Sequence, residues 1–355
     1  MKIELDKLDS NFKQESALDL ENLEYHYYLS DEFYISGADH YSEKGKCLVR
    51  LPLEVLEKVE AEAGNNGVYH LAHTPAGVRL RFKTNSPYIA LKTVCKSSAT
   101  GNFSFDLYER KDFSYRHVRN IAGLGNVTNF ENFAKVGDGS LKEFEIQFPI
   151  LTCVNDVYIG LEAGSIIEKP SDYYYNDPIV FYGSSITHGG LSSRPGNAYT
   201  AIISRRLCAE YINLGFSGNA KGEKAMAEYI ASLKMSAFVL DYDHNAPNPE
   251  HLANTHENFF KTVREKNPTL PIVMVSRPNT LYNTLDDAKR RQVIFKTYLN
   301  AKSAGDNNVY FVDGSSFLLC DTADTQIVDQ CHPSDAGFLR MAEIIGGVLK
   351  TAIKK

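Results

Sequence analysis

The hydrophobic pattern of this chain changes near residue 179, and this change constrains the fold more than any other feature. Residues 77–84 alternate apolar and charged side chains, and four further segments continue the pattern, at 88–94, 103–108, 144–148 and 157–161. A period of two is typical of strands that bury one face. We therefore predict an antiparallel, jelly-roll-like β-sandwich over residues 31–168, interrupted by a helical or irregular stretch near 52–62.

From Ile179 onward, short apolar strands alternate with longer amphipathic stretches. This order implies βαβ crossovers, and therefore a parallel sheet with helices on both faces. We expect an α/β domain over residues 179–355. The predicted strands are 179–182, 211–214, 236–241, 271–275 and 309–312, and the predicted helices are about 197–210, 250–265, 284–303 and 335–353.

Two further segments lack a clear period. Residues 169–178 contain two prolines, so we interpret them as a linker between the two domains. Residues 1–30 are polar with a few aromatic side chains, and we interpret them as an N-terminal extension that wraps the sandwich or is partly disordered.

The charge of the chain excludes several classes of partner. The 355 residues carry a net charge of −6 without long blocks of like charge, which argues against a nucleic-acid partner and against a polybasic membrane surface. No apolar run approaches the roughly 18–20 residues that span a bilayer, and residues 1–10 lack the apolar core of a signal peptide. We therefore expect a cytoplasmic protein, or a secreted one if a leader has been removed; the sequence leaves an oligomer open.

The six cysteines are scattered, with no CxxC pair and no Cys/His cluster. This spacing is typical of buried thiols and does not predict a zinc site. We expect neither a metal nor a cofactor.

A serine follows the first strand of the second half. The apolar residues Ile179–Tyr182 lead into Gly183, which allows a tight turn, and Ser185 follows two residues later. This is not the Gly-x-Ser-x-Gly elbow of α/β-hydrolases, because Thr187 stands where the last glycine would be. The turn fits an exposed nucleophile; the alternatives, which are the usual case for such a turn taken alone, are a helix N-cap and an ordinary loop.

An acid and a histidine lie three positions apart near the end of the chain. Asp329 and His332 precede Pro333, and one turn would place both side chains on the same side. Asp329 could then hold the Nδ1 atom of His332 while Nε2 faces a serine hydroxyl. The alternative is an aspartate cap beside a surface histidine.

Two more loops follow predicted strands. Residues 213–219 contain Gly218, whose N–H could bind an oxyanion, and residues 241–247 contain Asn245, whose side-chain amide could do the same. The alternatives are a simple glycine turn and an Asx-turn before a proline.

Taken in order, these segments resemble the conserved blocks of SGNH hydrolases in the GDSL esterase superfamily. Residues 183–187 match the serine block with Gly-Ser-Ser-Ile in place of Gly-Asp-Ser-Leu, Gly218 matches the glycine block, Asn245 the asparagine block and residues 329–333 the acid–histidine block. Asn245 departs most from the pattern, because it lies in Asp-His-Asn-Ala-Pro and not in Gly-x-Asn-Asp. The resemblance implies a flavodoxin-like, three-layer hydrolase domain.

The first half resembles the β-sandwich that precedes the hydrolase domain in one branch of this superfamily. That branch carries a Gly-x-Asp-Leu-Tyr signature, which appears here at residues 104–108 as Ser-Phe-Asp-Leu-Tyr. Two-domain enzymes of similar layout include carbohydrate O-acetylesterases. The resemblance covers residues 31–355 and implies hydrolysis of a small acyl ester, such as an acetyl group on a small molecule or an oligosaccharide.

The resemblance also implies the roles of the residues. Ser185 would be the nucleophile, His332 the base and Asp329 its orienter, while the N–H groups of Ser185 and Gly218 and the side chain of Asn245 would form the oxyanion hole. No metal is needed for this chemistry.

Two residues that follow the serine are candidates for substrate contact. His188 is expected to face the cleft, and Arg194 to meet a sugar hydroxyl or to form a structural ion pair. Two other functions stay open: a lipase or acyl-thioesterase of the same superfamily, and a catalytically silent carbohydrate-binding protein.

Overall fold

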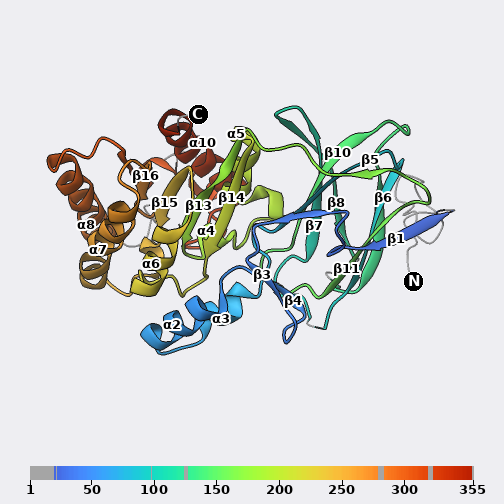
Figure 1. Ribbon diagram of the computed structural model, residues 1–355. Coiled ribbons are helices and arrows are strands. Elements are labelled where there is room, and N and C mark those ends of the chain that lie inside the picture. The colour runs from blue at the N-terminus through green and yellow to red at the C-terminus, as the bar shows by residue number, and fades with distance from the viewer. Residues whose placement is uncertain are drawn as a thin grey trace.

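The computed structural model describes residues 20, 22–96, 98–123, 127–278, 284–318 and 323–353. It shows two parts side by side, with antiparallel sheets in the N-terminal part and a parallel sheet between helices in the C-terminal part (Figure 1). In the described ranges, no helix has the length and apolar character needed to cross a membrane.

The N-terminal part is a β-sandwich, as predicted. Every strand pair in its two main sheets is antiparallel, and the core between them contains Leu80, Phe82, Leu91, Phe105 and Ile146. One sheet has the order β1 (Leu23–Tyr27), β11 (Asp156–Glu162), β6 (Tyr88–Val94), β9 (Phe130–Lys135). The other has the order β12 (Ile167–Glu168), β5 (Arg79–Thr84), β10 (Lys142–Gln147), β7 (Ser104–Lys111), β8 (Ser114–Ala122), with β2 (Tyr34–Ser36) also pairing with β5. A small separate sheet pairs β3 (His40–Ser42) with β4 (Cys47–Val49).

The side chains of β7 alternate between the sandwich core and the outer face of the sheet. Phe105 and Leu107 lie in the sandwich core. Successive side chains of a strand point to opposite faces. Asp106 and Tyr108 therefore face outward, where they contact the C-terminal part at Arg194.

The C-terminal part is the expected three-layer α/β domain. Its parallel sheet has the order β14-β13-β15-β16-β17, which is the 2-1-3-4-5 order of flavodoxin-like folds. The strands are β13 (Tyr175–Gly183), β14 (Ala209–Gly215), β15 (Ala237–Asp241), β16 (Ile272–Val275) and β17 (Val309–Val312).

Side chains of β13 alternate between the two helical layers. Ile179 and Phe181 pack in the cluster that includes residues 199–207 (α5) and 335–352 (α10), whereas Val180 and Tyr182 pack in the cluster that includes residues 224–232 (α6), 249–266 (α7) and 284–303 (α8). Short helices lie in the connecting loops. The long helices are α5 (Tyr199–Leu207), α6 (Lys224–Ser232), α7 (Pro249–Lys266), α8 (Thr284–Ser303) and α10 (Asp335–Ala352); the short ones are α4 (Ser185–His188), α9 (Ala323–Gln326), and the 3-10 turns η4 (Pro195–Asn197), η5 (Asp243–Asn245) and η6 (Gly314–Ser316).

Two predicted segment boundaries differ from the structure. The expected extension 1–30 contains strand β1, which pairs with β11; most of the remaining extension lies outside the described residues. The expected linker 169–178 ends in the first residues of β13, because Tyr175 pairs with Ala209 of β14. Helix α6 was not predicted from the sequence.

The helical interruption of the N-terminal half packs against the C-terminal half. It consists of α2 (Leu53–Ala63) and α3 (Gly67–Ala72). Leu51, just before α2, and Val55, Leu56 and Val59 of α2 belong to the same core cluster as Tyr182. The range 31–168 predicted for the sandwich domain therefore includes a segment, residues 49–72, that completes the core of the hydrolase half.

Candidate active site

Three candidate loops leave three adjacent strands of the parallel sheet. Strand β13 leads to Ser185, β14 on one side leads to Gly218, and β15 on the other side leads to Asn245. The strands are parallel, so their carboxyl ends meet at one edge of the sheet, where sites of open α/β folds form. The topology brings these three residues to a single place.

Ser185 is the first residue of α4, and the preceding turn is tightly packed. A Cβ atom on Gly183 would lie 2.1 Å from Oγ1 of Thr187 and 2.4 Å from the carbonyl oxygen of Asp241, so only glycine fits there. Ser184 is the N-cap, and its hydroxyl accepts a hydrogen bond of 3.2 Å from the N–H of Ile186. Strand end and cap together fix the direction of the Ser185 side chain.

Ser185, His332 and Asp329 form a continuous hydrogen-bonded chain. The Ser185 hydroxyl lies 2.8 Å from Nε2 of His332, and Nδ1 of His332 lies 2.8 Å from Oδ2 of Asp329. A carboxylate only accepts, so Nδ1 carries the proton and Nε2 is left to accept from the serine. This is the arrangement of a nucleophile, a general base and an orienting acid.

A closed loop holds the acid against the histidine. The N–H of Val328 donates to the carbonyl oxygen of His332 at 2.9 Å, and Oδ1 of Asp329 accepts from the N–H groups of Cys331 and His332 at 2.7 and 2.6 Å. Partial burial alone would raise the pKa of Asp329, but the hydrogen bonds from His332 and Cys331 outweigh it and lower the pKa. Asp329 therefore stays ionised beside the imidazole.

Three groups at this edge of the sheet are the candidate oxyanion donors. The N–H of Ser185 lies in the first turn of α4, where an N–H group has no acceptor within the helix. Gly218 has φ +72°, and the N–H of Asn219 donates to the carbonyl of Phe216 at 2.8 Å, as in a turn with glycine at its third position. Oδ1 of Asn245 accepts from the N–H of Ala220 at 3.3 Å, which leaves its NH₂ group as a donor.

A buried carboxyl supports the serine turn, and no sequence pattern predicted this role. Asp241 ends β15, and its Oδ2 accepts from Thr187 at 3.1 Å and from Tyr199 at 2.8 Å. Burial raises the pKa of Asp241 to about 7, against the lowering effect of the two hydroxyl donors. An acidic residue at the end of a strand is common in sequences, so its presence alone does not predict the contacts of Asp241 with Thr187 and Tyr199.

The prediction that His188 contacts substrate is wrong. Its side chain is 0 % exposed, with Nδ1 2.9 Å from the hydroxyl of Ser217 and Nε2 3.0 Å from that of Thr74. The Arg50 guanidinium lies 3.5 Å from the same Nε2 atom. Burial and then the charge of Arg50 hold the pKa of His188 well below its usual value. The imidazole links α4 to the loop of Gly218 and stays neutral.

Arg194 forms the ion pair that was the second of its two predicted roles. Its Nη1 donates to Oδ2 of Asp106 at 2.9 Å and to the hydroxyl of Tyr108 at 2.8 Å, both from the sandwich. The residues of the sandwich signature thus contact the loop that follows the serine helix.

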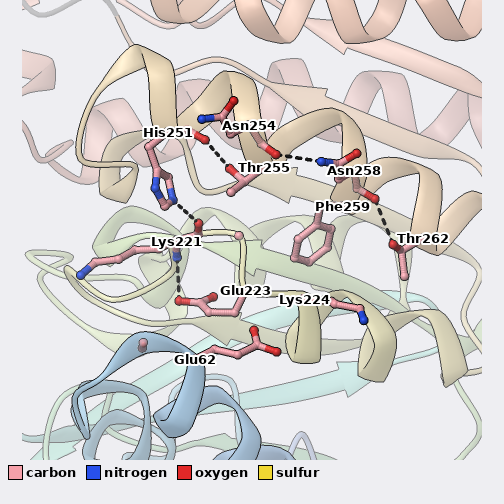
Figure 2. Close-up of a pocket in the computed structure, with 12 residues that line it drawn as sticks. Glu62, Lys221, Glu223, Lys224, His251, Asn254, Thr255, Asn258, Phe259 and Thr262 are labelled. Carbon is pink, nitrogen blue, oxygen red and sulfur yellow. Dashed lines mark hydrogen bonds between the residues drawn. The ribbon is translucent and has the colours of Figure 1, made fainter.

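A cavity of about 610 Å³ lies beyond the loop of Gly218, between α2, α6 and α7 (Figure 2). His251 of α7 points toward this loop, and its Nε2 is 2.7 Å from the carbonyl oxygen of Lys221. Phe259, Glu62 and Lys224 also line the cavity, whereas Ser185 and His332 do not. The cavity is therefore separate from the candidate triad. In the described ranges, no group of three or more His, Cys, Asp or Glu side chains is placed to hold a metal ion.

Two family models match this chain, one for each half. Residues 176–350 match the GDSL-like lipase/acylhydrolase family, and residues 23–167 match the N-terminal domain of SGNH-hydrolase-type esterases named after the GxDLY signature. A comparison with curated protein sequences found no significant match.

Solved structures with the same two-part fold include a protein of Bacteroides ovatus ATCC 8483 described as a GDSL-like lipase. It is 27% identical, with a TM-score of 0.78 over 94% of this chain and 99% of the other. The salicylyl-acyltransferase SsfX3 from a tetracycline biosynthetic pathway is 19% identical, with a TM-score of 0.76 over 94% and 100%. A family two carbohydrate esterase of Clostridium thermocellum, solved with cellohexaose, is 17% identical, with a TM-score of 0.59 over 78% and 93%.

Proposed function

Because the chain belongs to the GDSL-like lipase/acylhydrolase family, we propose that it hydrolyses small acyl esters with Ser185 as its nucleophile. Family membership makes the protein an ester hydrolase; the residues and the substrate are the new assignment. The observation that carries it is the chain of two 2.8 Å contacts from Ser185 through His332 to Asp329. A serine hydroxyl is a weak nucleophile until an adjacent base takes its proton.

The first half of the reaction forms an acyl-enzyme. Nε2 of His332 takes the hydroxyl proton as Ser185 Oγ bonds to the ester carbonyl carbon, and the carbonyl oxygen becomes an oxyanion. The N–H groups of Ser185 and Gly218 and the NH₂ of Asn245 stabilise this charge. When the C–O bond to the alcohol breaks, the imidazolium gives its proton to the leaving oxygen, and Asp329 stabilises the imidazolium throughout.

The second half reverses the roles for water. Nε2 of His332 takes a proton from water as the water oxygen bonds to the acyl carbon. The second oxyanion collapses, the bond to Ser185 Oγ breaks, and the proton returns to the serine. The products are a carboxylic acid and free enzyme, and no group outside the chain is consumed except water.

For the substrate we propose an acetyl ester on a carbohydrate. The resemblance of the two-domain layout to carbohydrate acetylesterases supports it, together with the shared fold of an esterase solved with a glucan oligosaccharide. A lipase or thioesterase would instead need a groove for a long acyl chain. A silent carbohydrate-binding protein would need no serine–histidine contact.

The deciding experiment compares wild type with Ser185→Ala on nitrophenyl acetate and nitrophenyl octanoate. We expect wild type to prefer the acetate and Ser185→Ala to lose activity with both, because the variant lacks the hydroxyl that forms the acyl-enzyme. The thermal melting of the variant should match wild type. Turnover by Ser185→Ala near the wild-type rate would contradict the nucleophile assignment, and a preference for octanoate would favour the lipase alternative.

The leaving group can be tested separately. Release of acetate from acetylated xylo-, manno- and gluco-oligosaccharides, with Ser185→Ala as the blank, would identify the sugar. Hydrolysis of nitrophenyl acetate without release of acetate from any of these glycans would support the esterase assignment and contradict the carbohydrate substrate.

A further inference from the structure

The loop of residues 191–197, here called the bridging loop, connects the serine helix to both halves of the molecule. The N–H of Gly190 donates to the carbonyl of Ser185 at 2.8 Å, and the N–H of Ser192 donates to the carbonyl of Gly189 at 3.2 Å. The loop therefore begins as a direct continuation of the turn that holds the nucleophile. We therefore expect a shift of the loop to displace the backbone of Ser185.

The sandwich holds this loop through a fully buried carboxylate. Asp106 is 0 % exposed, and its Oδ2 accepts from Nη1 of Arg194 at 2.9 Å and from the N–H of Gly196 at 2.7 Å. On the other oxygen, Asn120 donates at 3.0 Å and Nε2 of His117 lies 3.4 Å away. Burial alone would raise the pKa of Asp106, but His117 and the charge of Arg194 outweigh it and lower the pKa.

The bridging loop packs tightly against the sandwich at Gly196. A Cβ atom on Gly196 would lie 2.0 Å from the hydroxyl of Tyr108 and 2.7 Å from Oδ2 of Asp106. Arg205 of α5 donates to the carbonyl oxygen of Gly196 at 2.5 Å, so this residue is held from both sides. Asn102, just before β7, also donates to the carbonyl of Ser193.

The other side of the loop is tied to the segment that carries the base. Oδ1 of Asp335 accepts from the N–H of Ser193 at 2.9 Å, and its Oδ2 accepts from Asn197 at 2.8 Å and from the Ser193 hydroxyl. Asp335 is the first residue of α10 and follows His332 by three positions. The loop thus spans the distance from Ser185 to the His332 segment.

We propose that Asp106 of the sandwich is a positioning residue for ester hydrolysis, which acts through the bridging loop on the contact between Ser185 and His332. The proposal rests on Ser185 and His332 being the nucleophile and base assigned above. It gives the Asp-Leu-Tyr part of the sandwich signature a mechanical role: Leu107 anchors the strand in the sandwich core, while Asp106 and Tyr108 hold the loop. The sandwich is then part of the catalytic apparatus without touching substrate.

The test compares Asp106→Asn with a matched control, Glu143→Gln. Glu143 lies on the neighbouring strand β10 and is also buried. It accepts from Arg110 at 3.0 Å, from Arg81 at 3.4 Å and from the N–H of Ser171 at 3.2 Å, and none of these partners belongs to the bridging loop. We expect Asp106→Asn to lower kcat on nitrophenyl acetate about 10- to 100-fold, since a misplacement of about 1 Å is enough for a 10²-fold loss. KM should stay within about twofold, and Glu143→Gln should keep wild-type kcat.

Labelling of Ser185 by a fluorophosphonate separates this proposal from the proposed function. Wild type that is labelled but hydrolyses no ester would overturn the substrate assignment, and the ratio of labelling rates between the variants would still report on Asp106. Equal labelling rates and equal kcat for folded Asp106→Asn and Glu143→Gln would overturn the positioning role.

Two further variants keep the test decisive. If Asp106→Asn does not fold, Arg194→Met removes the ion pair and leaves Asp106 only the N–H of Gly196 in the loop. An unchanged kcat in that variant would overturn the proposal that the ion pair between sandwich and loop positions Ser185. Asp335→Asn should lower kcat as well, and the double variant with Asp106→Asn should lose little more than the worse single variant, because both act through one loop. If the kcat losses of the two single variants multiply in the double variant, Asp106 and Asp335 do not act through the same loop.

Discussion

Of the three candidate oxyanion donors, Asn245 is the one that would act through its side chain, whereas the other two are backbone N–H groups. Its orientation follows from one contact, the 3.3 Å hydrogen bond that its Oδ1 accepts from the N–H of Ala220 in the neighbouring loop. Since Ala220 follows Gly218 by two residues, this contact joins two of the three donors into one unit. A side-chain donor can be removed without disturbing the backbone.

Replacing Asn245 by alanine should therefore reduce catalysis with little effect on binding. We expect kcat on nitrophenyl acetate to fall on the order of 10²–10³-fold, about 2.7–4 kcal/mol of transition-state stabilisation, with KM nearly unchanged. Steady-state kinetics at a temperature well below melting would measure this.

Asn248→Ala is a matched control in the same loop. Asn248 caps α7 by accepting from the N–H of His251 at 2.8 Å, so its loss should lower the free energy of unfolding by about 1 kcal/mol and leave kcat unchanged. A kcat for Asn245→Ala close to that of Asn248→Ala would remove Asn245 from the oxyanion hole.

Single residues were predictable from sequence where a local pattern fixes their geometry. Asp329 and His332 lie in one short loop, so their contact could be expected from spacing alone. His188 could not be placed, because its neighbours Arg50 and Thr74 come from a segment more than 100 positions earlier. Arg194 had two open roles for the same reason: its partner Asp106 lies in the other half of the chain.

At the scale of elements, the turn from β13 into α4 depends on the end of β15. Asp241 is 4 % exposed and receives hydroxyl hydrogen bonds from Thr187 in α4 and Tyr199 in α5. Its carbonyl oxygen also accepts from the N–H of Ser184 at 3.4 Å. One residue thus joins a strand to two helices directly below the nucleophile.

The buried carboxyl makes stability depend on pH. In the folded protein burial raises the pKa of Asp241 to about 7, against 3.8 as its ordinary value. Between these values the unfolded chain is ionised while the folded protein holds the proton, so stability falls as pH rises and the loss is complete above about pH 7. Asp241→Asn removes this dependence, and its free energy of unfolding relative to wild type should rise by about 3 kcal/mol from pH 5 to pH 8. Urea denaturation at several pH values would measure the difference.

Asp138→Asn provides the comparison for this titration. Asp138 is exposed, and hydrogen bonds from the Ser140 hydroxyl and N–H lower its pKa to about 2, so it is ionised in both states throughout pH 5–8. The difference between this variant and wild type should stay constant over that range. A flat profile for Asp241→Asn as well would mean that Asp241 is ionised in the folded protein.

Elements were predictable where their signal is local. The buried strands of the parallel sheet are short apolar runs, and α10 begins with the cap Ser334, whose hydroxyl accepts from Gly337. Helix α6 has no such signal: its N-cap Glu223 makes no side-chain cap bond, and the N–H of Ala225 is instead capped by Glu62. That partner lies 163 positions earlier, beyond the reach of a pattern along the chain.

At the scale of the whole molecule, the two halves share a core. Segment 49–72 precedes most of the sandwich in sequence, yet it packs with the hydrolase half. Arg50 is buried there, and its guanidinium donates to the carbonyls of Asn213 at 2.6 Å and Gly215 at 3.1 Å, at the end of β14. A change in periodicity can mark where a sheet type ends, but it cannot show that an earlier helix completes a later core.

We therefore expect residues 169–355 to be unstable when produced alone. They would expose the surface covered by Leu51, Val55, Leu56 and Val59. At about 1.5–3 kcal/mol for each buried side chain, the loss is comparable to the 5–15 kcal/mol by which a typical domain is stable. It would also leave the β14 carbonyls without Arg50, next to the loop of Gly218. Circular dichroism and nitrophenyl acetate hydrolysis would measure fold and activity, and residues 1–168 added in trans should restore both. Wild-type turnover by residues 169–355 alone would show that the hydrolase half folds without segment 49–72 and would contradict the shared core.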